Sequence, residues 1–187
     1  GLSRPDNLAL SYPRIVEYPW ILRNLPCEGK ILDVGSAGSQ FPVVLACLGY
    51  EVWTIDVRNY EYAGLCENLH SVTGDVRESK FPGGFFDAVV AVQVIAHIGL
   101  GRYGEDVEID GDKRTIREIT KILRKGAPVL LTLPFGKRCV SHLHRVYDKE
   151  ALSWMLEGLK IERMDIFLKT RLWKRSTEEQ AKEVDSS

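Results

Sequence analysis

The sequence lacks the features of a membrane-spanning protein, a disulfide-stapled protein or a dedicated nucleic-acid binder. No window approaches the roughly 18 consecutive apolar residues that a bilayer-spanning helix needs. The four cysteines are widely spaced and include no Cys-x-x-Cys pair, so we expect reduced thiols. Lys and Arg number 25 against 26 Asp and Glu, so the chain has none of the basic excess that nucleic-acid binding favours.

The first residues contain prolines and no apolar stretch of signal-peptide length. We therefore expect a cytoplasmic, single-domain protein of 187 residues, with no nucleic-acid or membrane partner. The expected division is an N-terminal segment (1–28), a central domain (29–170) and a polar tail (171–187). Within the tail, 174–187 holds one Val and one Ala among polar residues, which is typical of a solvated or frayed terminus.

The central domain alternates short apolar runs with amphipathic segments. Runs too short for helices predict strands at Ile31–Val34, Val52–Ile55, Leu69–Val72, Ala88–Val92, Val129–Leu133 and Ile161–Leu168. Helices are predicted at Gln40–Leu48, at Asp112–Leu123 and after Asp148, which can cap the last of them. Continuous apolar runs indicate strands that are covered on both faces. The pattern predicts a Rossmann-like, doubly wound α/β fold: a mostly parallel sheet between two helical layers, with no further strand evident after Leu168.

Ligands of such a sheet bind outside the carboxyl ends of its strands. The first strand runs into the small residues Gly35–Ser39, which let a ligand approach the backbone, and then into a helix start with unpaired N–H groups. Acidic residues mark three strand ends: Asp33 in the first strand, Asp56 at the end of the second and Asp75 after the third. An acid at the position of Asp56 can accept both ribose hydroxyls of a nucleoside.

With these residues, the sequence resembles the class I S-adenosylmethionine (SAM)-dependent methyltransferases, from about residue 29 to residue 168. The resemblance implies SAM as the cofactor and an acid at the first strand that helps to place the methionine amino group. One departure is that the three alternating glycines of the family fall on Gly35, Ala37 and Ser39. The cofactor-binding residues that the resemblance implies are Asp33, Gly35, Ser36, Gly38, Asp56, Val57, Asp75, Val76 and Gln93.

A narrower resemblance is to a branch of these methyltransferases found near sugar and surface-polysaccharide genes. It rests on residues 96–104, on 110–112 and on 144–147, although members carry Glu where this chain has Ala96. His97 follows the fourth predicted strand and is our candidate general base for an acceptor hydroxyl, unless it packs beside the cofactor or caps a helix. The aromatic residues of segment 1–28 are expected either to cover the cofactor cleft or to be core contacts: Tyr12, Tyr18 and Trp20.

The loop after Leu133 carries three permanent cations and two histidines before the first acid, Asp148. Arginine side chains suit phosphate and carboxylate groups. The expected acceptor is therefore a small polar molecule, for example a phosphorylated or nucleotide-linked sugar, methylated on oxygen. Its expected contacts are Arg138, His144 and Arg145. The alternatives are that these residues are merely solvated, and that Arg145 pairs with Asp110 or Asp112.

Two other functions remain open. The altered glycines and Ala96 are also compatible with a SAM-binding regulatory or scaffold protein without turnover. An NAD(P)-dependent oxidoreductase should show Gly-x-Gly-x-x-Gly, but Ala37 and Gln40 replace the second and third glycines of that window. No metal site is expected, because His142 and His144 have no third ligand near them in the sequence.

Overall fold

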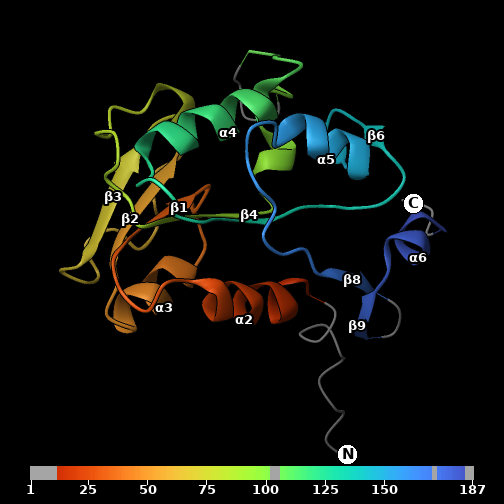
Figure 1. The fold of residues 1–187 in the computed structure, drawn as a ribbon. Coiled ribbons are helices and arrows are strands. Elements are labelled where there is room, and N and C mark those ends of the chain that lie inside the picture. The colour runs from red at the N-terminus through yellow and green to blue at the C-terminus, as the bar shows by residue number, and fades with distance from the viewer. Residues whose placement is uncertain (1–11, 102–105, 170–171, 184–187) are drawn as a thin grey trace, which may run out of the picture.

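A computed structural model describes residues 12–101, 106–169 and 172–183 of the chain. At its centre lies a parallel sheet of five strands in the order β3-β2-β1-β4-β5 (Figure 1). Each of the first five predicted strands is present with nearly the expected bounds. They are β1 (Lys30–Val34), β2 (Glu51–Asp56), β3 (Leu69–Thr73), β4 (Ala88–Val92) and β5 (Val129–Thr132).

Helices cover both faces of this sheet, as Figure 1 shows. On one face lie α2 (Arg14–Asn24) and α3 (Phe41–Cys47), and on the other lie α4 (Gly111–Ile122) and α5 (Lys149–Met155). A separate hydrophobic cluster fills each interface, since alternate residues of β1 point to opposite faces: Ile31 joins the α2–α3 cluster and Leu32 the α4–α5 cluster. The predicted three-layer α/β fold is confirmed.

The order of the strands reverses between β1 and β4. From β1 the chain builds β2 and β3 on one side, and it then returns to build β4 and β5 on the other. The loops that leave β1 and β4 therefore diverge at the carboxyl edge of the sheet, which opens a crevice between them. Two short 3-10 helices follow strands at this edge: η1 (Val76–Glu78) after β3 and η2 (Ile95–His97) after β4.

Helix α2 was not predicted from the sequence. Pro13 stands at its N-cap, where proline is tolerated, but Pro19 lies inside it and lowers the helical propensity of this segment. The helix forms because Ile21 is fully buried in the cluster that α2 shares with α3, so tertiary packing outweighs local propensity. Of the N-terminal segment that we expected at 1–28, residues 1–11 lie outside the described part of the chain.

The C-terminal part differs from the prediction. Only the end of the expected Ile161–Leu168 strand is extended, as β8 (Ile166–Lys169). The expectation that no strand follows Leu168 was wrong, because β9 (Trp173–Ser176) pairs antiparallel with β8 and α6 (Glu178–Glu183) comes next. The β8–β9 hairpin forms a two-stranded sheet of its own, apart from the central one. Its strands are not covered on both faces, so β9 needs no apolar run and gave no strand signal in the sequence.

The loop after β5 also contains regular structure. Strands β6 (Cys139–Val140) and β7 (Arg145–Val146) form a short antiparallel hairpin just before α5. Asp148 caps α5 as predicted, because its side chain accepts a hydrogen bond from the backbone N–H of Ala151. None of the helices in the described ranges is both long and apolar enough to cross a membrane.

Candidate active site

A cavity of about 250 Å³, here named the switch-point cavity, opens at the carboxyl edge of the sheet where the strand order reverses. It gathers residues from the ends of β1, β2 and β4, from η1 and η2, and from α2. Seven of the residues singled out in the sequence line it: Gly35, Asp56, Val57, Asp75, Val76, Gln93 and His97.

The turn after β1 needs a glycine at its first position. Gly35 has a φ of 78°, and a Cβ there would overlap the side chain of Val94. Ala37 has the unusual φ of 20°, and its backbone N–H donates to Asp56 over 3.2 Å. Ala37, at one of the family's glycine positions, is thus accommodated, and Asp56 at the end of β2 holds the turn in place. Gly38 is exposed and does not line the cavity.

Asp33 and Ser36 lie beneath this turn and not on the cavity wall. The hydroxyl of Ser36 donates to the backbone oxygen of Asp33 over 3.1 Å, and both residues are buried. Burial raises the pKa of the Asp33 carboxyl to about 7, because the Ser36 hydroxyl and the charge of Arg14 offset only part of the desolvation. The site therefore contains a buried acid that changes charge near neutral pH.

Asp56 is held by backbone groups at the end of β2. Its two oxygens accept from the N–H groups of Arg58 and Ala37, at 2.9 Å and 3.2 Å, and the side chain of Arg58 also pairs with it. A carboxylate oxygen can accept more than one hydrogen bond, so Asp56 is suited to hold ligand hydroxyls at this wall.

Asp75 is engaged by a neighbour that the sequence analysis missed. The guanidinium of Arg77 donates to both of its oxygens, with Nε distances of 3.1 and 3.0 Å and a terminal nitrogen at 2.6 Å. Burial alone would raise the pKa of Asp75, but the hydrogen bonds and charge of Arg77 hold that pKa below its ordinary value. Most of the acceptor capacity of Asp75 is thus used inside the protein, and the apolar side chain of Val76 forms the adjoining wall.

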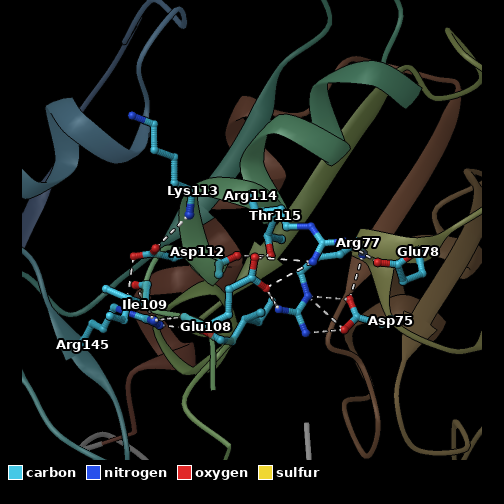
Figure 2. Close-up of polar contacts among 12 residues, drawn as sticks. Asp75, Arg77, Glu78, Glu108, Ile109, Asp112, Lys113, Arg114, Thr115 and Arg145 are labelled. Atoms are coloured by element: carbon cyan, nitrogen blue, oxygen red, sulfur yellow. Dashed lines mark hydrogen bonds and ion pairs between the residues drawn. The ribbon is translucent and has the colours of Figure 1, made fainter. Parts of the chain in front are cut away.

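Arg77 also links this wall to the loop before α4 (Figure 2). Its other terminal nitrogen lies 2.5 Å from Glu108, and Glu108 in turn contacts Arg114 of α4. Arg114 completes the row by pairing with Glu78 of η1. Figure 2 shows this row of alternating charges, which fixes η1 against the loop and against α4.

Gln93 ends β4 in a strained conformation. Its φ of 58° is unusual for a residue with a side chain, and its backbone N–H is held by Thr132 at the end of β5 over 3.0 Å. The side-chain amide of Gln93 donates over 2.7 Å to Glu17 of α2. Helix α2 and the residue that follows β4 therefore meet at this point.

His97 is oriented by the β6–β7 hairpin. Its Nδ1 lies 2.6 Å from the backbone oxygen of Leu143, and because a carbonyl only accepts, Nδ1 carries the hydrogen. The basic nitrogen of the neutral ring is then Nε2. The ring of His144 meets the His97 ring edge to face, with centroids 6.4 Å apart.

Arg145 pairs with an acid of α4, the alternative to acceptor binding that the sequence left open. It is only 5 % exposed, and its Nε lies 3.5 Å from Asp112 of α4. It also donates to three backbone oxygens on both sides of the loop before α4, those of Ile98, Glu108 and Ile109. Arg145 therefore holds this loop and is not placed to contact an acceptor. Arg138 is exposed and does not line the switch-point cavity.

A second and larger cavity, here named the β5 cavity, has a volume of about 1110 Å³. It lies between the edge of β5, helices α2 and α5 and the β8 strand, and His144 and Lys137 belong to its walls. Most of its walls are apolar, for example Leu131, Leu133 and Phe167. Arg14 and Gln93 line both cavities, so the two spaces adjoin at these residues.

The aromatic residues of the N-terminal segment are distributed between core and cavity. Tyr18 stacks on Phe41 with ring centroids 4.2 Å apart, as a core contact would. Trp20 donates its indole N–H to Asp165 over 2.7 Å, and Trp20 and Tyr12 line the β5 cavity.

Arg14 and Glu17 were not among the predicted site residues, because no helix was predicted over this segment. The sequence pattern that could have indicated them is the spacing of Arg14, Glu17 and Ile21, which places the three residues on one face of a helix. No group of three potential metal ligands is found in the described ranges.

The fold and the cavity at its strand-order reversal define a class: this is the fold of the class I SAM-dependent methyltransferases. A SAM-dependent methyltransferase from Methanosarcina mazei superposes with a TM-score of 0.64 at 18 % identity, over 84 % of this chain and 92 % of that one. A protein from Pyrococcus horikoshii gives a TM-score of 0.66 at 15 % identity, over 83 % of this chain and 84 % of the other.

A third similar structure is the 1,6-didemethyltoxoflavin-N1-methyltransferase of Burkholderia thailandensis, solved with 1,6-didemethyltoxoflavin and S-adenosylhomocysteine bound. Its TM-score is 0.64 at 16 % identity, over 82 % of this chain and 69 % of that chain. The chain itself belongs to the family described as Caenorhabditis protein of unknown function, DUF268, which matches residues 61–183. A comparison with curated proteins gives no significant match.

Proposed function

We propose that this protein is a SAM-dependent methyltransferase that acts on a small-molecule acceptor, with oxygen as the methylated atom. The observation that carries the proposal is the switch-point cavity, which brings the Gly35 turn, Asp56 and Gln93 together at the reversal of strand order. The Burkholderia enzyme with bound S-adenosylhomocysteine supports it, because a similar fold there holds the demethylated cofactor.

The residues present fit this cofactor. Gly35 has no side chain, and any Cβ there would overlap Val94, so the turn leaves its backbone open to the ligand. Asp56 offers a carboxylate, fixed by backbone N–H groups, to the ribose hydroxyls. The buried carboxyl of Asp33 lies just beneath the turn, where a ligand ammonium would favour its ionised form. Val76 supplies an apolar wall for the base.

Bound SAM would supply an electrophilic methyl group on sulfur, with a neutral thioether as the leaving group. The contribution of the protein would be orientation, because alignment of the two reactants provides much of the acceleration in such a transfer. We propose His97 as the general base, through Nε2, since the hairpin fixes its Nδ1 hydrogen on Leu143.

The acceptor in this proposal is a small polar molecule of the sugar type that bears an anionic group. With Arg145 committed to Asp112, the cations that support this choice are Lys137 in the wall of the β5 cavity and Arg138 on the same loop. A phosphorylated or nucleotide-linked sugar has the matching charge.

The first test is calorimetric binding of S-adenosylhomocysteine. Asp56→Ala is expected to weaken binding by on the order of 1.5–3 kcal/mol, the scale of charge-assisted hydrogen bonds. Asp110→Ala removes an exposed acid whose side chain forms no cap on α4, and it should leave the affinity unchanged. Equal affinities for wild type and Asp56→Ala, or preferential binding of NAD, would refute the assignment.

Turnover separates the enzyme from a SAM-binding regulatory protein. Transfer of labelled methyl from SAM would be followed with a neutral sugar and with its phosphorylated and nucleotide-linked forms. Transfer to the anionic forms supports the proposal, whereas tight S-adenosylhomocysteine binding without transfer to any member of an acceptor panel favours the regulatory function.

A further inference from the structure

The switch-point cavity and the β5 cavity adjoin at one place. Among the described residues, Arg14 of α2 and Gln93 at the end of β4 are the ones that line both. A methyl donor held in the first cavity and an acceptor entering through the second would therefore meet beside these two side chains, because in-line transfer needs both reactants on one axis.

A buried carboxylate stands at this junction on the side of the β5 cavity. Glu17 is 7 % exposed and lines the β5 cavity. Its Oε1 accepts from the Gln93 amide over 2.7 Å, and its Oε2 pairs with Arg14 one helical turn away. Both residues that join the cavities thus bind the same carboxylate.

The free-energy cost of burying Glu17 with Arg14 and Gln93 points to a role beyond folding. An Arg–Glu pair within one helix forms equally well on an exposed face, where neither charge loses its hydration. Here Glu17 is buried, and its partner Gln93 is held in a left-handed conformation that costs free energy. Strain and buried charge at the meeting point of two cavities are typical of a ligand-binding group.

We propose that Glu17 is the acceptor-binding carboxylate: it accepts a hydrogen bond from the O–H or N–H group of an acceptor that enters through the β5 cavity. Arg14 and Gln93 are the positioning residues, because each holds one oxygen of Glu17. This inference deepens the proposed function and rests on it. It assigns Glu17 a place distinct from that of His97, which lines the switch-point cavity and not the β5 cavity.

The test uses two cofactor analogues, so it needs no knowledge of the acceptor. S-adenosylhomocysteine has a neutral sulfur at the reacting position, whereas sinefungin has an amine-bearing carbon there, which places an ammonium where the methyl group is transferred. If Glu17 faces that position, wild type binds sinefungin more tightly than S-adenosylhomocysteine. In Glu17→Gln this preference should fall by roughly tenfold or more, the scale of one charge-assisted hydrogen bond. Affinities would be measured by titration calorimetry.

Two further variants make the result specific. Glu118 of α4 forms a similar three-residue-spaced pair with Lys121 on the opposite face of the sheet, so Glu118→Gln should leave the preference unchanged. Gln93→Met removes the amide that holds Oε1 of Glu17 without changing any charge, so it should lower the preference for sinefungin. Because Gln93 is uncharged, a lowered preference in Gln93→Met reports the position of the Glu17 carboxylate and not a change in the charge of the site.

The outcomes separate the two proposals. Failure of wild type to bind S-adenosylhomocysteine overturns the proposed function. Binding of S-adenosylhomocysteine with an equal sinefungin preference in wild type, Glu17→Gln and Glu118→Gln overturns the role of Glu17. If circular dichroism shows that Glu17→Gln does not fold, Gln93→Met decides: a lowered preference supports the role of Glu17, and an unchanged or raised one overturns it.

Discussion

At the scale of single residues, Asp33 is the most unusual group of the site. It is 4 % exposed, and burial raises the pKa of its carboxyl from 3.8 to about 7. The native state therefore holds a proton between these two pH values that the unfolded chain releases. The favourable contribution of this proton to folding is complete below about pH 3.8 and is lost as the pH rises through about 7.

We predict that this group lowers the free energy of unfolding by on the order of 4 kcal/mol between pH 4 and pH 8. Asp33→Asn cannot ionise and should lack that part of the pH dependence, so it should be the more stable protein at pH 8. Urea unfolding of both proteins at several pH values measures the difference. Identical pH profiles for the two proteins would show that Asp33 is ionised throughout.

At the scale of elements, the loop before α4 is held by side chains from distant parts of the chain. Arg145 of β7 binds three of its backbone oxygens and pairs with the buried Asp112, and Arg77 of η1 binds Glu108 (Figure 2). The sequence could suggest the pair of Arg145 with an acid but could not select Asp112, since the register of β7 against α4 depends on the fold.

We predict that Arg145→Ala destabilises the protein by about 3–5 kcal/mol, because it leaves the buried carboxylate of Asp112 without its cation. Arg138→Ala, an exposed substitution on the same loop, should change stability by less than about 0.5 kcal/mol. Denaturant unfolding of both variants checks the contrast. A small effect of Arg145→Ala would mean that the loop keeps its place without this side chain.

The central strands could be predicted because their signal is local. Runs such as Ala88–Val92 are apolar at every position, which only a strand covered on both faces requires. Helix α2 could not be predicted, because Pro19 inside it opposes a helix and its buried face contains Glu17, which becomes favourable only beside Gln93 and Arg14. The part of the site at strand ends was therefore visible in the sequence, and the part contributed by α2 was not.

At the scale of the whole molecule, stability is concentrated around the five-stranded sheet. Two hydrophobic clusters cover its faces, and among the described residues neither includes any residue after Leu156. The β8–β9 hairpin pairs with itself and is tied to α2 by the bond from Trp20 to Asp165. Strand β9 is short, has two charged residues at its centre and no fully buried residue, which explains why it escaped prediction and also why the hairpin adds little to the core.

We predict that amide hydrogen exchange is much slower in the central sheet than in the β8–β9 hairpin. Amides of β1 and β4 should exchange only through global unfolding, whereas those of β8 and β9 should exchange through local opening at a much lower free energy. Saturating S-adenosylhomocysteine, at about 100 times its dissociation constant, should add about 2.7 kcal/mol of protection to β1 and β4 and none to β8 and β9. This follows because the switch-point cavity is lined only by residues up to Ile98 among those described. Exchange followed by mass spectrometry, with and without the ligand, measures both effects. Equal protection of β8 and β1, raised equally by the ligand, would instead mean that the hairpin unfolds together with the sheet.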